Sequence, residues 1–204
     1  GIRDLVRSRG LGDVYKRQGL NGTILHYDGS AWTSMTIPSS VSSCSLVDIW
    51  GTSATDVFAT MGGSYTCGGI LHYDGSGWSI SGQIPVPGSD DVYPLYALWG
   101  SGSNNVYAAG QDGILAHYDG SGWSAVQLSN GAGAEPPLQA IWGSSLSDIY
   151  AVDDYGTIQH YNGSAWAPTN VGDEWLTGVW GTAGNNVFVV GHEGKVMHLS
   201  LIHI

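Results

Sequence analysis

Five histidines recur along the chain and are candidates for chemistry, because imidazole is the commonest metal ligand and a frequent acid or base. They are His26, His72, His117, His160 and His198. Successive members lie 46, 45, 43 and 38 residues apart, which places them at one point of a repeated unit. Equivalent points of successive units are too far apart to share one ion at about 2.0 Å. We therefore predict structural histidines, each hydrogen-bonded within its own unit to a turn or to an Asp or Asn.

Acidic residues also recur, and could bind calcium or act as paired catalytic carboxylates. They are Asp28, Asp74 and Asp119, each followed by Gly-Ser, and Asp56 and Asp148. Asn162 replaces the first kind in one copy, and Asn105 and Asn186 replace the second. A turn needs only a side-chain acceptor, which asparagine also supplies. With no Gly-x-Ser-x-Gly elbow, phosphate loop or zinc spacing in the sequence, we predict no catalytic residue, metal site or cofactor.

Eight of the nine tryptophans occupy two repeated positions, which favours a role in the core over ligand binding. One set is Trp50, Trp99, Trp142 and Trp180, each followed by glycine. The other set is Trp32, Trp78, Trp123 and Trp166, each shortly after an Asp-Gly-Ser or Asn-Gly-Ser turn. Trp175 alone lies outside both patterns. It is a candidate for ligand contact, with core packing as the alternative.

Two sequence elements alternate through residues 19–198. NGTILHYDGSAW recurs as GGILHYDGSGW, DGILAHYDGSGW and YGTIQHYNGSAW, and DIWGTSATDVFAT recurs as ALWGSGSNNVYAA, AIWGSSLSDIYAV and GVWGTAGNNVFVV. Each unit of about 45 residues predicts four short strands. Strand A ends at Trp-Gly, strand B is the Val/Ile-Tyr/Phe-Ala segment, strand C holds the histidine and strand D opens at the second tryptophan. An Asp-Gly-Ser or Asn-Gly-Ser hairpin turn joins C to D.

One small four-stranded sheet cannot bury both faces until its neighbours stack on it, so this repeat is typical of β-propeller blades. We predict an all-β chain of four-stranded antiparallel blades that forms an incomplete arc of about four blade equivalents. The expected units are a partial blade at 19–36, blades at 45–82, 94–128 and 137–168, and a partial blade at 175–198.

The two cysteines are placed to form a disulfide. In a propeller, the connection into strand A and the loop between strands B and C emerge on the same face. Cys44 and Cys67 occupy these two segments of one blade, so a bond between them is geometrically plausible and fits an oxidising compartment. Two free thiols are the alternative.

The two ends lack the repeat and are related to each other through the genetic code. DVYKRQ at 13–18 and LSLIHI at 199–204 can be encoded by reverse-complementary DNA. That DNA resembles the transposon end used in sequencing-library preparation, and SRGLG at 8–12 reads as the adjoining adapter. We interpret residues 1–18 and 199–204 as translated adapter rather than native protein, and therefore expect a fragment of a longer gene. A short basic N-terminal arm is the alternative.

The charge excludes several kinds of partner. The chain carries 17 acidic residues against 6 Lys and Arg, a net charge of −11, and every basic residue except Lys195 lies within residues 1–18. Nucleic-acid binding needs a basic surface that the repeat region lacks. Anionic membranes are disfavoured for the same reason, and no apolar run is long enough to cross a bilayer.

The WGS, DVYA and GILHYDGSxW repeat resembles the propeller repeats of secreted and surface proteins from myxobacteria and related bacteria. It is similar, more weakly, to tectonin-type propellers. The resemblance implies a secreted or cell-surface protein, or a periplasmic one. The tectonin likeness implies glycan recognition.

Function in a propeller belongs to the loops and the central channel, while the repeat supplies the frame. The strand D to A connections and the B to C loops together predict one acidic, aromatic rim. Its candidate ligand-binding residues are Asp90, Asp91, Tyr93, Asp153, Asp154, Tyr155 and Trp175. Such a rim suits neutral sugars, cations or a basic protein. The sequence favours a non-catalytic module that binds or scaffolds a protein or glycan partner.

A propeller-fold lyase or glycosidase remains the alternative. Asp48 is the one strand A acid expected near the channel. No arginine occurs in residues 19–198, so a clamp for anionic substrates is missing and the enzyme hypothesis is the weaker.

Overall fold

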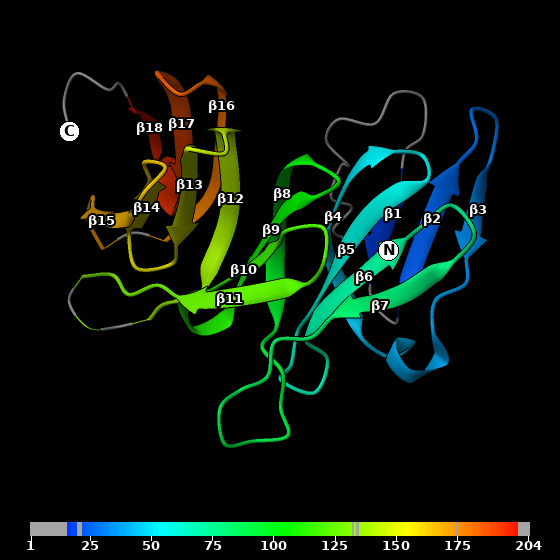
Figure 1. Ribbon diagram of the computed structural model, residues 1–204. Helices are drawn as coiled ribbons and strands as arrows, with labels where there is room; N and C mark the ends of the chain where they lie inside the picture. Colours follow the sequence, from blue (N-terminus) through cyan, green and yellow to red (C-terminus); the bar gives the residue numbers. More distant parts are fainter. Residues whose placement is uncertain (1–15, 20–21, 132, 134, 174, 200–204) are drawn as a thin grey trace.

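The predicted strand segments form five small antiparallel sheets that follow one another along the chain, as Figure 1 shows for the computed structural model. The structure describes residues 16–19, 22–131, 133, 135–173 and 175–199. In every sheet, hydrogen-bonded neighbours are consecutive in the sequence. The all-β fold and the four-stranded blades are therefore confirmed.

Three sheets are complete blades with strands in the order A, B, C and D. The first contains β4 (Ser45–Ser53), β5 (Asp56–Gly62), β6 (Gly69–Tyr73) and β7 (Trp78–Gly82). The second contains β8 (Leu95–Gly102), β9 (Asn105–Gly110), β10 (Ile114–Tyr118) and β11 (Trp123–Gln127). The third contains β12 (Leu138–Ser145), β13 (Asp148–Asp153), β14 (Thr157–Tyr161) and β15 (Trp166–Asn170).

The two outer sheets have three described strands each. One contains β1 (Lys16–Gly19), β2 (Thr23–Tyr27) and β3 (Trp32–Met35), and the other β16 (Leu176–Ala183), β17 (Asn186–Gly191) and β18 (Val196–Leu199). Strand β1 crosses the boundary predicted at residue 19 and pairs with β2 in the position of strand B. The sequence predicted only strands C and D here. The backbone of an open strand edge can pair with any extended segment, whatever its side chains.

Short 3₁₀ turns interrupt three connections. They are η1 (Ser39–Val41), η2 (Gln111–Gly113) and η3 (His192–Gly194). The turns η2 and η3 lie between strands B and C of their blades, where the sequence predicted glycine-rich loops.

In strand B of the complete blades, alternating residues enter the cores on opposite sides of the sheet. On β13, Ile149 and Ala151 pack into the cluster shared with the preceding blade. Tyr150 and Val152 pack into the cluster shared with the following sheet. Both faces are therefore buried, as the two-residue period of a strand requires when sheets lie on either side.

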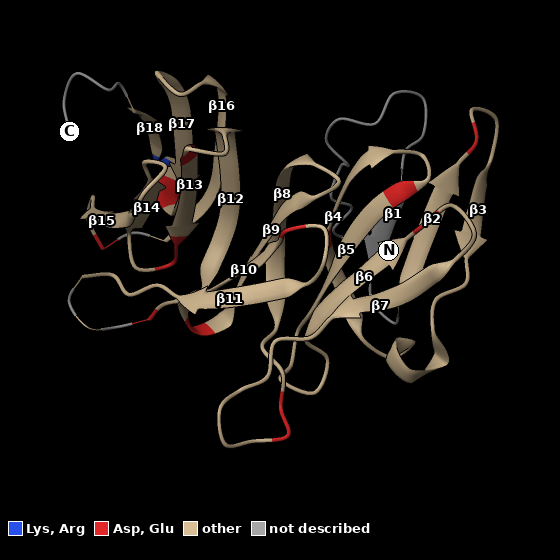
Figure 2. Ribbon diagram, viewed as in Figure 1, with Lys and Arg blue, Asp and Glu red and all other residues tan. Residues whose placement is uncertain are grey.

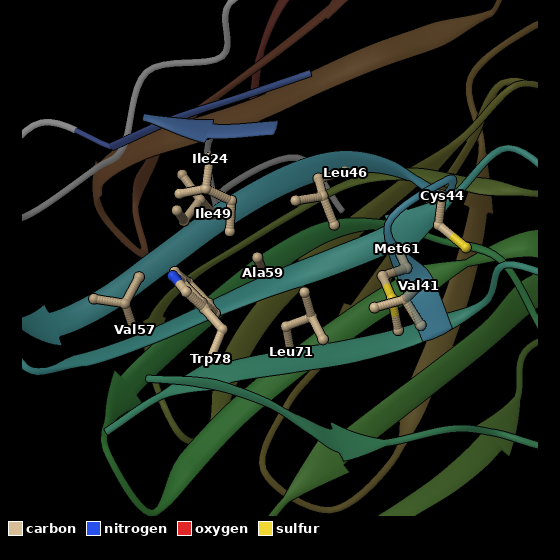
Figure 3. Packing of buried hydrophobic residues seen from close by; sticks show 10 residues of the cluster. All are labelled: Ile24, Val41, Cys44, Leu46, Ile49, Val57, Ala59, Met61, Leu71 and Trp78. Atoms are coloured by element: carbon tan, nitrogen blue, oxygen red, sulfur yellow. The ribbon is translucent and has the colours of Figure 1, made fainter. Parts of the chain in front are cut away.

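Figure 3 shows the first of these inter-sheet cores. Ile24 of β2 points towards Ile49 and Leu46 of β4, while Val57 and Leu71 come from β5 and β6. The cluster belongs to two sheets at once, so neither sheet has a complete core alone.

The repeated Trp-Gly pair determines how closely the sheets approach. A Cβ atom on Gly181 would lie 2.7 Å from the Trp142 ring of the preceding blade. The equivalent contacts are 2.6 Å between Gly100 and Trp50 and 2.8 Å between Gly143 and Trp99. No side chain fits at these distances, so Trp50, Trp99 and Trp142 each require a glycine in the next blade.

The blades form an open arc. Strand A of one blade contacts strand A of the next, in the pairs β4 with β8, β8 with β12 and β12 with β16. In Figure 1 the sheet of β1–β3 and the sheet of β16–β18 lie at opposite ends of the row. Within the described part of the chain, no helix is long and apolar enough to span a membrane.

We predict that two equivalent tryptophans contribute unequally to stability. Trp142 is 8% exposed against Gly181, whereas Trp180, at the same position of the last sheet, is 47% exposed. Trp142→Ala should lower the free energy of unfolding by about 3–5 kcal/mol because it opens a cavity between two sheets. Trp180→Ala should cost about 1 kcal/mol or less. Urea unfolding followed by circular dichroism measures both, and equal losses would contradict the stacking described above.

Candidate functional site

Four of the five repeated histidines bond to the Asp or Asn that follows strand A of their own blade. The distances from Nε2 to the Oδ1 acceptor are 2.7 Å for His72 with Asp56, 2.5 Å for His117 with Asn105, 2.8 Å for His160 with Asp148 and 2.9 Å for His198 with Asn186. An asparagine Oδ1 only accepts, so the imidazole donates in those copies. Each ring also stacks on the strand B aromatic, as His160 does on Tyr150 at 4.3 Å between ring centroids. His26 occupies the same position on β2.

Hydroxyl groups complete this arrangement but do not make a catalytic triad. Ser144 donates to Oδ2 of Asp148 while His160 contacts Oδ1. In a serine hydrolase the histidine lies between the serine and the acid, so that it can accept the serine proton. Here the acid lies in the middle. These three side chains therefore link the turn between strands A and B to strand C.

The Asp-Gly-Ser turns are held by hydrogen bonds within the turn. Oδ1 of Asp74 accepts from the Ser76 amide and hydroxyl at 2.8 and 2.7 Å and from the Gly77 amide at 3.1 Å. These bonds lower the pKa of Asp74 to about 2, with the Ser76 side chain as the largest cause. Asn162 makes the same bonds through Oδ1. The turns need an acceptor oxygen, and Asn and Asp both provide it.

The second set of repeated tryptophans lies beside the tyrosine that follows each histidine. The ring centroids are 5.2 to 5.5 Å apart. The pairs are Tyr27 with Trp32, Tyr73 with Trp78, Tyr118 with Trp123 and Tyr161 with Trp166. These tryptophans therefore pack against strand C in the four sheets that have a described strand D.

Asp48, the candidate acid of strand A, joins two blades. Its Oδ2 accepts from the backbone amide of Leu98 in the next blade at 2.7 Å, and its Oδ1 from the Ile49 amide at 2.9 Å. Both oxygens face backbone donors. The carboxylate therefore acts as an inter-blade contact in this structure.

Cys44 and Cys67 are joined by a disulfide bond, with their Cα atoms 5.3 Å apart. The bond links the connection before β4 to the loop between β5 and β6. These two segments lie at the end of the blade that carries the B to C loops. The disulfide therefore limits the movement of this end of the blade.

Two of the predicted ligand-binding residues are buried. Tyr93 is 6% exposed within the core shared by the first and second complete blades. Asp153 is fully buried, and its Oδ1 accepts from the Tyr155 and Thr157 amides at 2.9 and 2.8 Å. Burial raises the pKa of Asp153.

The other predicted residues lie on three separate loops. Asp90 and Asp91 belong to the loop between β7 and β8, where Ser89 donates to Asp91 at 2.9 Å. Asp154 and Tyr155 follow β13, and Tyr155 is 57% exposed. Burial raises the pKa of Asp154. Trp175 precedes β16. Figure 2 shows acidic residues on turns and loops and also on some strands.

A polar network that sequence reasoning missed crosses from the first complete blade to the second. Tyr65 donates to Asp112 at 2.8 Å, Gln111 donates to the other carboxylate oxygen at 2.9 Å, and Tyr96 donates to Gln111 at 2.6 Å. Burial and the Asp112 carboxylate raise the pKa of Tyr65 to about 12. Asp112 has φ of 53°, in the left-handed region that non-glycine residues seldom adopt. The only sequence signal was that Gln111 and Asp112 are not repeated in other blades.

A pocket of about 320 Å³ opens near the start of β16, lined by Asp173, Trp175, His192 and Glu193. Trp175 is 56% exposed, and the His192 ring meets it edge-on with centroids 5.1 Å apart. The His192 amide donates to the Trp175 carbonyl at 2.9 Å. The sequence identified Trp175 but not the three residues that accompany it, because they come from two separate connections.

No family model and no curated protein match the chain, whereas several solved structures share its fold. The extracellular domain of BT4673 from B. thetaiotaomicron, described as a one-component system, has a TM-score of 0.70 at 14% identity, over 95% of this chain and 27% of that one. An ancestral GH74 enzyme has a TM-score of 0.71 at 12% identity, over 98% and 30%. YCF48 bound to D1 peptide has a TM-score of 0.62 at 16% identity, over 96% and 68%. The chain thus spans under a third of the first two, and the likeness shows the propeller fold.

We predict that Asp148 tolerates asparagine but not alanine. Asp148→Asn should leave the free energy of unfolding nearly unchanged, because Asn105 and Asn186 fill the equivalent positions with a histidine partner. Asp148→Ala leaves His160 and Ser144 without their acceptor and should cost about 1–2 kcal/mol. Urea unfolding of both variants measures this difference. A large loss for Asp148→Asn would instead point to a role for the negative charge.

Proposed function

We propose that the chain is a non-catalytic β-propeller module of a secreted or cell-surface protein, which binds a protein or glycan partner through one face. We define this loop face as the B to C loops of the blades and the connections that enter β4, β8, β12 and β16. Antiparallel blades place all of these segments at the same end. The turns between A and B and between C and D form the opposite end.

One observation carries the proposal. Polar residues at repeated positions are engaged within the frame, as His160 with Asp148 and Asp74 with Ser76 illustrate. Unrepeated polar and aromatic residues, including Tyr155 and the Trp175 pocket, lie on the loop face. A rigid frame with variable loops is how such scaffolds bind partners.

The solved structures support the location and the kind of partner only by analogy. Two descriptions of the BT4673 domain call it extracellular, and YCF48 is bound to a peptide. The disulfide between Cys44 and Cys67 also favours an oxidising compartment. The likeness of the repeat to myxobacterial and tectonin-type propellers adds glycans as a partner class. The adapter origin of residues 1–18 and 199–204 rests on their genetic-code relation alone.

A propeller-fold glycosidase or lyase is the second candidate, favoured by the fold shared with a GH74 enzyme. Glycoside hydrolysis usually needs two carboxyl groups about 5–9.5 Å apart across the scissile bond. Both oxygens of Asp48, the candidate acid, accept hydrogen bonds from the backbone amides of Leu98 and Ile49. The binding module is therefore the better supported proposal.

Arrays of glycans and of basic peptides test the binding module with the 204-residue chain. We expect binding that falls at least about threefold in Asp90→Asn and Tyr155→Ala, which change the loop face. Asp119→Asn, in a turn at the opposite end, should leave binding unchanged because Asn162 makes the same turn.

Three results would contradict the proposed binding module. The first is that the chain binds to neither array, and the second is that binding depends on Asp119 but not on Asp90 or Tyr155. The third is that the chain releases new reducing ends from the arrayed glycans.

A further inference from the structure

The acid in the loop between strands B and C accepts side-chain hydrogen bonds in the second complete blade, and its counterpart in the last sheet does not accept one from any described side chain. In the second complete blade, Asp112 accepts from Tyr65 and Gln111 through its two oxygens. Glu193 occupies the equivalent position in η3, also in the left-handed region at φ of 56°. Among the described residues, no side chain donates a hydrogen bond to the Glu193 carboxylate. This loop therefore presents its acid to the pocket rather than to a neighbouring blade.

The aromatic side of the same pocket is fixed by the backbone. The His192 amide donates to the Trp175 carbonyl at 2.9 Å, and the Lys195 amide donates to the His192 carbonyl at 3.1 Å. The first bond joins the two connections and the second closes η3. The His192 ring meets the Trp175 ring edge-on. Trp175 remains more than half exposed, so its ring is available for contact.

The negative charge of the pocket favours a cationic ligand. Asp173 and Glu193 are both acidic, and Lys195, the nearest basic residue in sequence, is not among the lining residues. An apolar ligand that covered the two carboxylates would remove them from water without compensating hydrogen bonds, which is unfavourable. A cation instead pairs with the carboxylates through charge-assisted hydrogen bonds and can lie over the indole face.

We propose that the pocket of Asp173, Trp175, His192 and Glu193 binds a basic side chain, lysine or arginine, of a partner polypeptide. This inference rests on the proposed binding function and names its partner chemistry. The volume of about 320 Å³ is at the lower end of the range for small ligand sites, about 300–1,000 Å³, and suits one side-chain end. The loop face then recognises the partner through an inserted anchor, which is a common source of binding energy.

The test uses Nα-acetyl-lysine amide as the probe, titrated into the ¹⁵N-labelled 204-residue chain. The backbone amides of η3 are the reporters. We expect saturable shifts of these amides that weaken as salt rises from 0.01 to 1 M, because the Debye length falls from about 30 to about 3 Å. Nε-acetylation removes the charge of the probe and should abolish the shifts.

Variants locate the site. Trp175→Leu, Glu193→Gln and Asp173→Asn should each weaken binding of the lysine probe by about threefold or more. Trp180→Leu is the matched control, because Trp180 is also exposed in the same sheet but does not line the pocket. It should leave the affinity unchanged.

Three results would overturn the inference: no shifts with the lysine probe, equal binding of the Nε-acetylated probe, or equal loss of affinity in Trp180→Leu. Shifts with methyl β-glucoside in place of lysine would identify a sugar site instead. In each case, binding of the chain to an array through Asp90 and Tyr155 would keep the proposed module valid. Loss of array binding together with probe binding would reject both.

Discussion

The contact between a strand A tryptophan and a glycine of the next blade is the constraint on which the structure depends. The Trp142 ring occupies the space that a Cβ atom on Gly181 would fill, and the contact recurs between Trp50 and Gly100 and between Trp99 and Gly143. These three rings pack in or against cores that two sheets share. A larger side chain in place of the glycine would push the two sheets apart. A smaller side chain in place of the tryptophan would leave a cavity, so neither residue can change independently of the other.

This constraint separates the residues of the frame from those available for function. The His160, Tyr150 and Trp142 rings form one row across a blade, set by the pairing register of β12, β13 and β14. Asp148 then holds the histidine. The polar side chains at these repeated positions are thus bonded within their own blade. Only the connections that differ between blades are free to vary, which is why the acidic and aromatic side chains without a repeat lie on the loop face.

The sequence predicted the frame well because it is periodic, and predicted the site less well because the site is not. A repeated Trp-Gly pair or histidine can be recognised by spacing alone. The burial of Tyr93 depends on a bridge between Pro85 and Val92 and on a bond from Val92 to Tyr65, neither of which has a local signal. The pocket likewise forms where two connections meet, so Trp175 was identified without Glu193.

The most direct test of the stacking constraint is a double-mutant cycle on Gly143 and Trp99. Gly143→Ala places a methyl group 2.8 Å from the Trp99 ring and should cost about 1–3 kcal/mol of unfolding free energy in urea. Gly122→Ala, where a Cβ meets nothing within 4 Å, should cost almost nothing. In a Trp99→Leu background the Gly143→Ala loss should shrink by half or more. Equal losses at the two glycines, or no coupling to Trp99, would contradict the account.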